Sequence, residues 1–377
     1  MLKTKDKIID LDAAAGADNP SSIHRAGARA ARRLDEARRA AAEVLGAHPD
    51  EIVFTSGGTE ANNLAIFGTI NFAPNRRQHI ITSVIEHVSV LEPCRELKRR
   101  GAAVTYLPVN REGLVSSSDL ARALRPETRL VSIGYANNEI GTVQPLRELA
   151  RVIRNFKKLK PKSYLPDPLF HTDACQAPGF LDCRVSTLGV DLLTLNSNKV
   201  GGSPGVGCLY MRRGVQLSPL LYGGGQEHGR RSGTENVPGI VEFAVALTLA
   251  VKSREKESAR LTKLRDYFLN HLLKWPGVIL NGSRGARLPN NINVSFAGTD
   301  SEFVVLSLDA AGVLCSSGSA CSTNDKSSSH VISAIGTEAD TTIRFTLGPA
   351  TTQPDLDHVL KILPDILRRG KKIRPTG

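Results

Sequence analysis

Short apolar segments alternate with amphipathic segments over residues 50–215. Apolar stretches such as "EIVFTS", "HIITS" and "LFHTDA" predict strands, and stretches such as "PLRELARVIRNFKKL" between them predict helices. Strands this apolar are typical of a mostly parallel sheet that helices cover on both faces. We therefore expect an α/β protein with a three-layer α/β/α architecture. In such sheets ligands bind beside the carboxyl ends of the strands, so the chemistry is expected just after each strand.

The pattern changes after residue 245. A long helical stretch that begins at residue 241 leads into shorter strands such as "NNINVSF", and an amphipathic helix that begins at residue 354 follows near the end of the chain. We predict a large domain over residues 9–245 and a smaller α+β C-terminal domain over residues 246–377, with residues 1–8 associated with the smaller one. Residues 313–330 contain a run of Ser, Gly and Ala around a cysteine, and this composition predicts a mobile polar loop.

Composition excludes several classes of protein. The 377 residues contain no apolar run long enough to span a bilayer, and the first residues lack the apolar core of a signal peptide. Six scattered cysteines without a CxxC pair are typical of reduced thiols, so we expect a cytoplasmic protein with no metal site.

The net charge of +12 is dispersed and aromatic residues are few, so no direct binding of nucleic acid is expected. The densest basic run, "KKLKPK" at 157–162, is read as a solvated helix end, with a docking patch as the alternative.

Polar residues with complementary chemistry follow the predicted strands. Gly58 and Thr59 open a helix after a strand, a geometry that suits either a tight turn or a phosphate site. Asp173 follows an apolar strand and needs a cation, while Lys199, expected to be partly buried, can act as a nucleophilic amine. His87 follows another strand and is either a structural residue or an aromatic ring that stacks on a ligand. Pyridoxal phosphate (PLP) would use all of these groups.

Five motifs point to one family. They read "TSGGTEANN", "NNEIG", "HTDACQ", "GGGQEHGRRSGT" and "SSGSACS", and they are distributed over almost the whole chain. With these motifs the sequence resembles the cysteine desulfurases of the iron–sulfur-cluster type, which are class V aminotransferases among the fold-type I PLP enzymes. The resemblance implies the PLP-dependent transferase fold, PLP as cofactor, L-cysteine as substrate and a homodimer. It also implies a sulfur acceptor, either a cluster scaffold protein or a tRNA-thiolating enzyme.

The resemblance assigns cofactor contacts to individual residues. Lys199 would bind the cofactor aldehyde, Asp173 would pair with the pyridine nitrogen, and His87 would stack on the ring and transfer a substrate proton. The other implied cofactor contacts are Gly58, Thr59, Asn138, Gln176, Asn196, Asn198 and, from the second subunit of a dimer, Thr234.

Substrate contacts and the sulfur carrier follow from the same resemblance. Arg344 would bind the substrate carboxylate, a task suited to a guanidinium, and Asn138 would lie beside the substrate. Cys321 matches the catalytic cysteine, whose thiolate takes the sulfur of L-cysteine as a persulfide while alanine is released. Catalysis would thus depend on Cys321, Lys199 and His87.

Three departures from the family keep other functions open. The lysine motif reads "NSNK" where Ser-x-His-Lys is usual, "GGSPG" follows it, and the segment between "DLDAAAGADNP" and "SSIHRAG" is shorter than in the family. One alternative is a class V aminotransferase or a selenocysteine or cysteine-sulfinate lyase, although an aminotransferase has no need of the loop cysteine. A second alternative is an inactive paralogue that serves as a binding module. The joint presence of the lysine, aspartate, histidine, arginine and cysteine argues against it.

Overall fold

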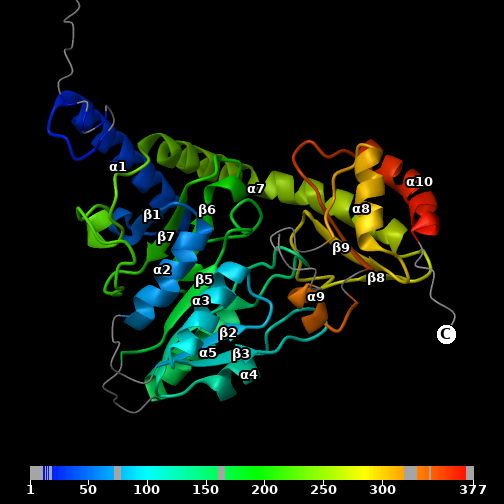
Figure 1. Ribbon diagram of the computed structural model, residues 1–377, viewed down its shortest axis with the longest axis horizontal. Coiled ribbons are helices and arrows are strands. Elements are labelled where there is room, and N and C mark those ends of the chain that lie inside the picture. Colours follow the sequence, from blue (N-terminus) through cyan, green and yellow to red (C-terminus); the bar gives the residue numbers. More distant parts are fainter. Residues whose placement is uncertain are drawn as a thin grey trace, which may run out of the picture.

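The architecture consists of a large sheet with helices on both faces and a small sheet joined to it by one long helix (Figure 1). This computed structural model describes residues 12, 14, 16, 19–71, 78–159, 166–317, 329–338 and 341–370. The expected α/β class is confirmed. In the part of the chain so described, no helix is both long and apolar enough to cross a membrane.

Seven strands form the large sheet in the order β1-β7-β6-β5-β4-β2-β3. Their bounds are β1 (Ile52–Thr55), β2 (His79–Ser83), β3 (Ala103–Leu107), β4 (Thr128–Ser132), β5 (Leu169–Asp173), β6 (Leu192–Asn196) and β7 (Gly207–Met211). The pairs β2–β3, β2–β4, β4–β5 and β5–β6 are parallel, whereas β7 is antiparallel to both β1 and β6. The expectation of a mostly parallel sheet is therefore correct.

Helices cover the two faces of this sheet because successive strand residues point to opposite sides. Val53 packs with helices α2 and α3, and its neighbour Phe54 packs in the core on the other face. That second core also receives apolar residues from α1, α4, α5, α6 and the first part of α7. The helix bounds are α1 (Arg25–Leu45), α2 (Gly58–Asn71), α3 (Val88–Arg99), α4 (Ser117–Ala123), α5 (Leu146–Leu159), α6 (Val185–Leu188) and α7 (Val237–Leu272).

The small sheet is antiparallel, in the order β10-β9-β8, and has its own core. The remaining bounds are β8 (Val278–Leu280), β9 (Asn291–Phe296), α8 (Ser301–Ala310), α9 (His330–Ala334), β10 (Thr342–Thr346) and α10 (Gln353–Arg369). Helix α7 belongs to both parts, since Phe243 and Leu247 pack in the large core and Phe268 and Leu272 in the small one. The division between residues 245 and 246 falls inside this helix and stays a prediction.

Two helix ends show how local chemistry sets the boundaries. Helix α4 is capped by Ser116, whose Oγ accepts from the N–H of Asp119, while the next two serines already belong to the helix. Helix α3 ends before Gly101, because this glycine takes a φ of +95° while its N–H donates to the carbonyl of Lys98.

Candidate active site

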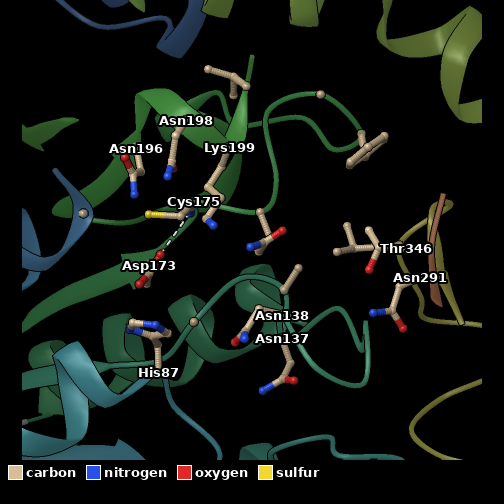
Figure 2. A pocket seen from close by; sticks show the side chains of 18 of the residues that line it. His87, Asn137, Asn138, Asp173, Cys175, Asn196, Asn198, Lys199, Asn291 and Thr346 are labelled. Atoms are coloured by element: carbon tan, nitrogen blue, oxygen red, sulfur yellow. Dashed lines mark hydrogen bonds between the residues drawn. The ribbon is translucent and has the colours of Figure 1, made fainter. Parts of the chain in front are cut away.

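A cavity of about 1330 Å³ lies beside the carboxyl ends of the central strands of the large sheet. Most of the site residues expected from the sequence line it, and Figure 2 shows several of them facing one another. These residues are Gly58, Thr59, His87, Asn138, Asp173, Gln176, Asn196, Asn198, Lys199 and Arg344. Cys321 lies outside the described residues. Thr234 is exposed in the loop before α7 and is not among the residues that line the cavity.

The amino end of helix α2 forms one wall of the cavity. The helix begins at Gly58, and the first N–H groups of a helix have no partner within it, so they are available to an anion. A Cβ at Gly58 would lie 2.9 Å from the Sγ of Cys175. Glycine is thus required here for the close approach of α2 to the segment that follows β5.

Asp173 ends strand β5 and faces the cavity without a cationic partner. Its Oδ2 accepts from Nδ2 of Asn62 at 2.7 Å and its Oδ1 accepts from the N–H of Cys175 at 3.0 Å (Figure 2 marks the second contact). No ion pair joins this carboxylate to any other described residue. A carboxylate held only by neutral donors has room for a positively charged group on its ligand-facing side.

Lys199 follows strand β6 in a short 3₁₀ turn, Ser197–Lys199. Lys199 is exposed among the described residues that line this wide cavity, so the partial burial expected from the sequence is not found. Asn196 and Asn198 lie beside it (Figure 2). Between them, the Oγ of Ser197 is buried and has no hydrogen-bond partner in the described part of the structure.

His87 lies at the amino end of helix α3 and caps it. Its Nδ1 accepts from the N–H of Ser89 at 3.2 Å and lies 2.7 Å from the Ser89 hydroxyl. The sequence analysis missed Ser89, and it also missed Asn62, which contacts both Ser89 and Asp173. The spacing offered a signal for Asn62, because it follows Gly58 by one helical turn and therefore lies on the same face of α2.

Arg344 comes from strand β10 of the small sheet and reaches the loop that follows β4. Its Nη1 donates to the carbonyl of Asn138 at 3.1 Å. The preceding residue, Asn137, has a structural role, since its Oδ1 accepts from the N–H groups of Glu139 and Ile140. The two sheets thus meet at the cavity through a contact between Arg344 and Asn138.

A buried carboxyl group that sequence reasoning did not identify lies beneath the site. The Oε1 of Glu86 accepts from the hydroxyl of Ser83 at 2.6 Å, and its Oε2 accepts from the N–H of Gly134 at 2.9 Å. Burial is the main cause that raises the pKa of Glu86 to about 8; the two hydrogen bonds oppose this shift and the charge of Asp173 adds a smaller contribution to it. This side chain is therefore a neutral acid at pH 7.

The loop that carries Thr234 is fixed to helices α1 and α2 by two ion pairs. Glu227 accepts two bonds from the guanidinium of Arg38, at 2.7 and 2.8 Å, and both side chains are buried. Arg231 pairs with Glu60 in the first turn of α2 at 2.8 Å. The loop is thus held firmly, and Thr234 on it does not line the cavity of its own chain.

Comparison with solved structures places the fold in a known class. A structure described as a NifS-like protein superposes with a TM-score of 0.85 at 35% identity, covering 93% of this chain and 92% of that one. A second, described as SspA in complex with cysteine, has a TM-score of 0.75 at 37% identity, covering 89% and 92%. The protein therefore has the NifS-like fold.

Sequence comparison identifies the family. Residues 10–359 match the family described as aminotransferase class-V. The cysteine desulfurase IscS of Dictyoglomus turgidum is 47% identical over 361 residues, which cover 95% of this chain and 89% of that protein. The chain belongs to the aminotransferase class-V family, a PLP-dependent family.

Proposed function

We propose that this protein is a PLP-dependent cysteine desulfurase, which converts L-cysteine to L-alanine and holds the sulfur as a persulfide on Cys321. The observation that carries the proposal is the Asp173 carboxylate without a cation, facing a cavity that Lys199 also lines. The proposal is supported by the similarity to cysteine desulfurases over 95% of the chain.

The residues of the cavity fit PLP. The amino end of α2 at Gly58 and Thr59, together with Asn196 and Asn198, would hold the phosphate, since helix amino ends bind such anions. Asp173 would accept a hydrogen bond from the protonated ring nitrogen, which supplies the missing cation. Further cofactor contacts would come from Lys199 at the aldehyde, Gln176 and Asn138 at the phenolic oxygen, and His87 at the ring face.

When bound, PLP withdraws electrons from the Cα atom of an amino acid joined to it. The guanidinium of Arg344, already placed by the carbonyl of Asn138, would bind the substrate carboxylate through two parallel hydrogen bonds. His87, which also lines the cavity, is the group that would exchange a proton with the substrate.

Cys321 would receive the sulfur. In the overall transfer the Cβ–S bond of L-cysteine breaks and an S–S bond forms, so that one thiol and one cysteine become one persulfide and one alanine. The described residues on either side of this segment are anchored at the cavity. Ser316 exchanges two backbone hydrogen bonds with Arg344, and the hydroxyl of Ser329 donates to Oε2 of Glu139 at 2.5 Å.

A homodimer and a sulfur acceptor complete the proposal. Thr234 does not line the cavity of its own chain and lies on a loop fixed by Arg38 and Arg231, so we infer that it serves the cavity of a second subunit. The persulfide would pass to an acceptor protein, either a scaffold for iron–sulfur clusters or a tRNA-thiolating enzyme.

The test is the release of alanine and sulfide from L-cysteine in the presence of a thiol reductant. We expect equal amounts of both products from the wild-type protein and neither from Cys321→Ala, which should still bind the yellow cofactor. Cys315→Ser is the matched control, because it removes a thiol six positions earlier and should leave both products unchanged. Formation of a keto acid in place of sulfide would overturn the proposal in favour of an aminotransferase.

A further inference from the structure

A chain of hydrogen bonds connects Asp173 to His87 through two residues with no role in the proposed chemistry. Asn62, fully buried in α2, places its Nδ2 2.7 Å from Oδ2 of Asp173 and 2.8 Å from Oγ of Ser89. Ser89, also buried, places its hydroxyl 2.7 Å from Nδ1 of His87. Three elements, β5, α2 and the start of α3, thus contribute to one continuous network.

The carboxylate fixes the direction of the first two bonds. Both oxygens of Asp173 face N–H donors, which is the pattern of an ionised carboxylate that can only accept. Turning the Asn62 amide around would place its oxygen against the carboxylate, so the NH₂ group must face Asp173. This group then uses its two hydrogens on Asp173 and Ser89, and the Ser89 oxygen is the acceptor of the second bond.

The same reasoning extends to the imidazole. Because the Ser89 oxygen accepts from Asn62, its own hydrogen is free to be donated to Nδ1 of His87. The backbone N–H of Ser89 points at the same nitrogen from 3.2 Å. A ring nitrogen that faces two donors carries no hydrogen, so the proton of the neutral ring is on Nε2. Nε2 has no hydrogen-bond partner among the described residues.

We propose that Ser89, oriented by Asn62, is a positioning residue that holds His87 in the tautomer with its proton on Nε2. His87 then presents a hydrogen-bond donor to the cavity, and it cannot accept a proton at Nε2 without first losing one. The catalytic meaning of this tautomer rests on the proposed desulfurase function, but the tautomer itself does not.

The decisive measurement is the ring ¹⁵N spectrum of the protein labelled at its histidines. The signals of His87 are assigned by their loss in His87→Gln. We expect long-range proton couplings that identify Nε2 as the protonated nitrogen in the wild-type protein. In Ser89→Ala the Nδ1 resonance should shift away from its hydrogen-bonded position. In Ser116→Ala, which removes a serine at the amino end of a different helix, no His87 signal should move.

Kinetics provide a second readout. Ser89→Ala should lower kcat at least tenfold with little change in KM. This loss is smaller than the roughly 10²–10⁴-fold rate increase that a general acid–base group contributes, because the imidazole itself is still present. Ser89→Thr keeps the hydroxyl and should recover most of this loss. A proton on Nδ1 in the wild-type protein would overturn the proposal, as would wild-type turnover in Ser89→Ala. If the expected tautomer is found but no variant, nor the wild-type protein, releases sulfide, the proposed function fails and this inference stands.

Discussion

Two aspartates at opposite ends of neighbouring strands show how the protein treats a carboxylate in a structural site and in a binding site. Asp191 precedes β6 and is almost fully buried, yet it pairs with Arg212 at 2.6 Å and Lys157 at 3.3 Å. It also accepts from the N–H of Phe170 at 2.9 Å. Asp173 ends β5, more exposed, and has only neutral donors. The chain supplies the counter-charge at one end of the sheet and leaves it to a ligand at the other.

The largest effect in this comparison is expected for activity. Asp173→Asn should lower kcat/KM for L-cysteine by a factor of roughly a thousand, the upper part of the range for loss of one electrostatic contact to a reacting group. The free energy of unfolding should change by no more than about 1 kcal/mol, since the amide removes an unpaired charge but offers one acceptor oxygen to two N–H donors, those of Asn62 and Cys175. Steady-state assays and chemical denaturation on the same preparation check both statements. Activity within tenfold of wild type would contradict the role assigned to Asp173.

The next effect concerns His171, which lies in the middle of strand β5, two residues before Asp173. Its ring is fully buried, with Nδ1 2.8 Å from the hydroxyl of Ser132 and Nε2 3.1 Å from that of Thr194. Burial lowers the pKa of His171 from 6.5 to about 4. Between pH 6.5 and pH 4 the unfolded chain binds a proton at this histidine and the folded protein does not. The part of the folding stability that depends on a neutral His171 is therefore fully present above pH 6.5 and is lost as the pH falls.

The size of this loss follows from the shift. We expect His171 to contribute about 3 kcal/mol to the fall in the free energy of unfolding between pH 6.5 and pH 4. Denaturant titrations at several pH values should show a shallower fall in His171→Gln. His358→Gln is the control, because His358 is exposed on α10 and its loss should leave the wild-type pH dependence in place. Equal slopes in all three proteins would refute the assignment.

Asp191→Asn tests the structural side of the comparison. It should lower the free energy of unfolding by about 2 kcal/mol, because it removes the negative charge that pairs with Lys157 and Arg212. The ion pair with Arg212 contributes the smaller part of this loss, since that side chain is half exposed to solvent. Turnover should stay within a factor of three of wild type, since the residue lies far along the strand direction from the cavity. Denaturation and kinetic measurements on this variant and on Asp173→Asn should thus give opposite patterns.

The smallest expected effect comes from Glu86, the neutral acid beside the unpaired carboxylate. Its pKa of about 8 lies above the ordinary 4.5, so between these values the folded protein keeps a proton that the unfolded chain has lost. Stability due to this group therefore falls as the pH rises. We expect the advantage of Glu86→Gln over wild type to grow by about 1.4 kcal/mol between pH 6 and pH 7. A constant difference in melting temperature at the two pH values would contradict this expectation.

The sequence predicted the elements that carry strong local signals. Strand β2 was found at its observed bounds, since "HIITS" is a short apolar run between breakers, and the last helix was found to within one residue at its start. Helix α7 was predicted from residue 241 but begins at Val237, because the Asn236 side chain caps it by accepting from the N–H of Gly239. Caps of this kind depend on the path of the preceding loop, which a local pattern does not contain.

The residues of the candidate site also fall into two groups, those with a local sequence signal and those without one. Asp173, Lys199 and His87 could be predicted because each lies at or shortly after the carboxyl end of an apolar strand, and parallel strands bring such positions to one edge. Ser89 and Glu86 could not, since their significance depends on which neighbours their side chains meet in three dimensions. The exposure of Lys199 was missed for the same reason, because no local pattern reports the width of a cavity.

The length of helix α7 determines how the two parts of the molecule are connected. Its 36 residues extend for about 54 Å, and its two halves complete two different hydrophobic cores. The middle of the helix, residues 248–260, contains no buried residue, so a cut there would leave each half packed in its own core. The helix therefore acts as a rigid connection that holds two separate cores at a fixed spacing.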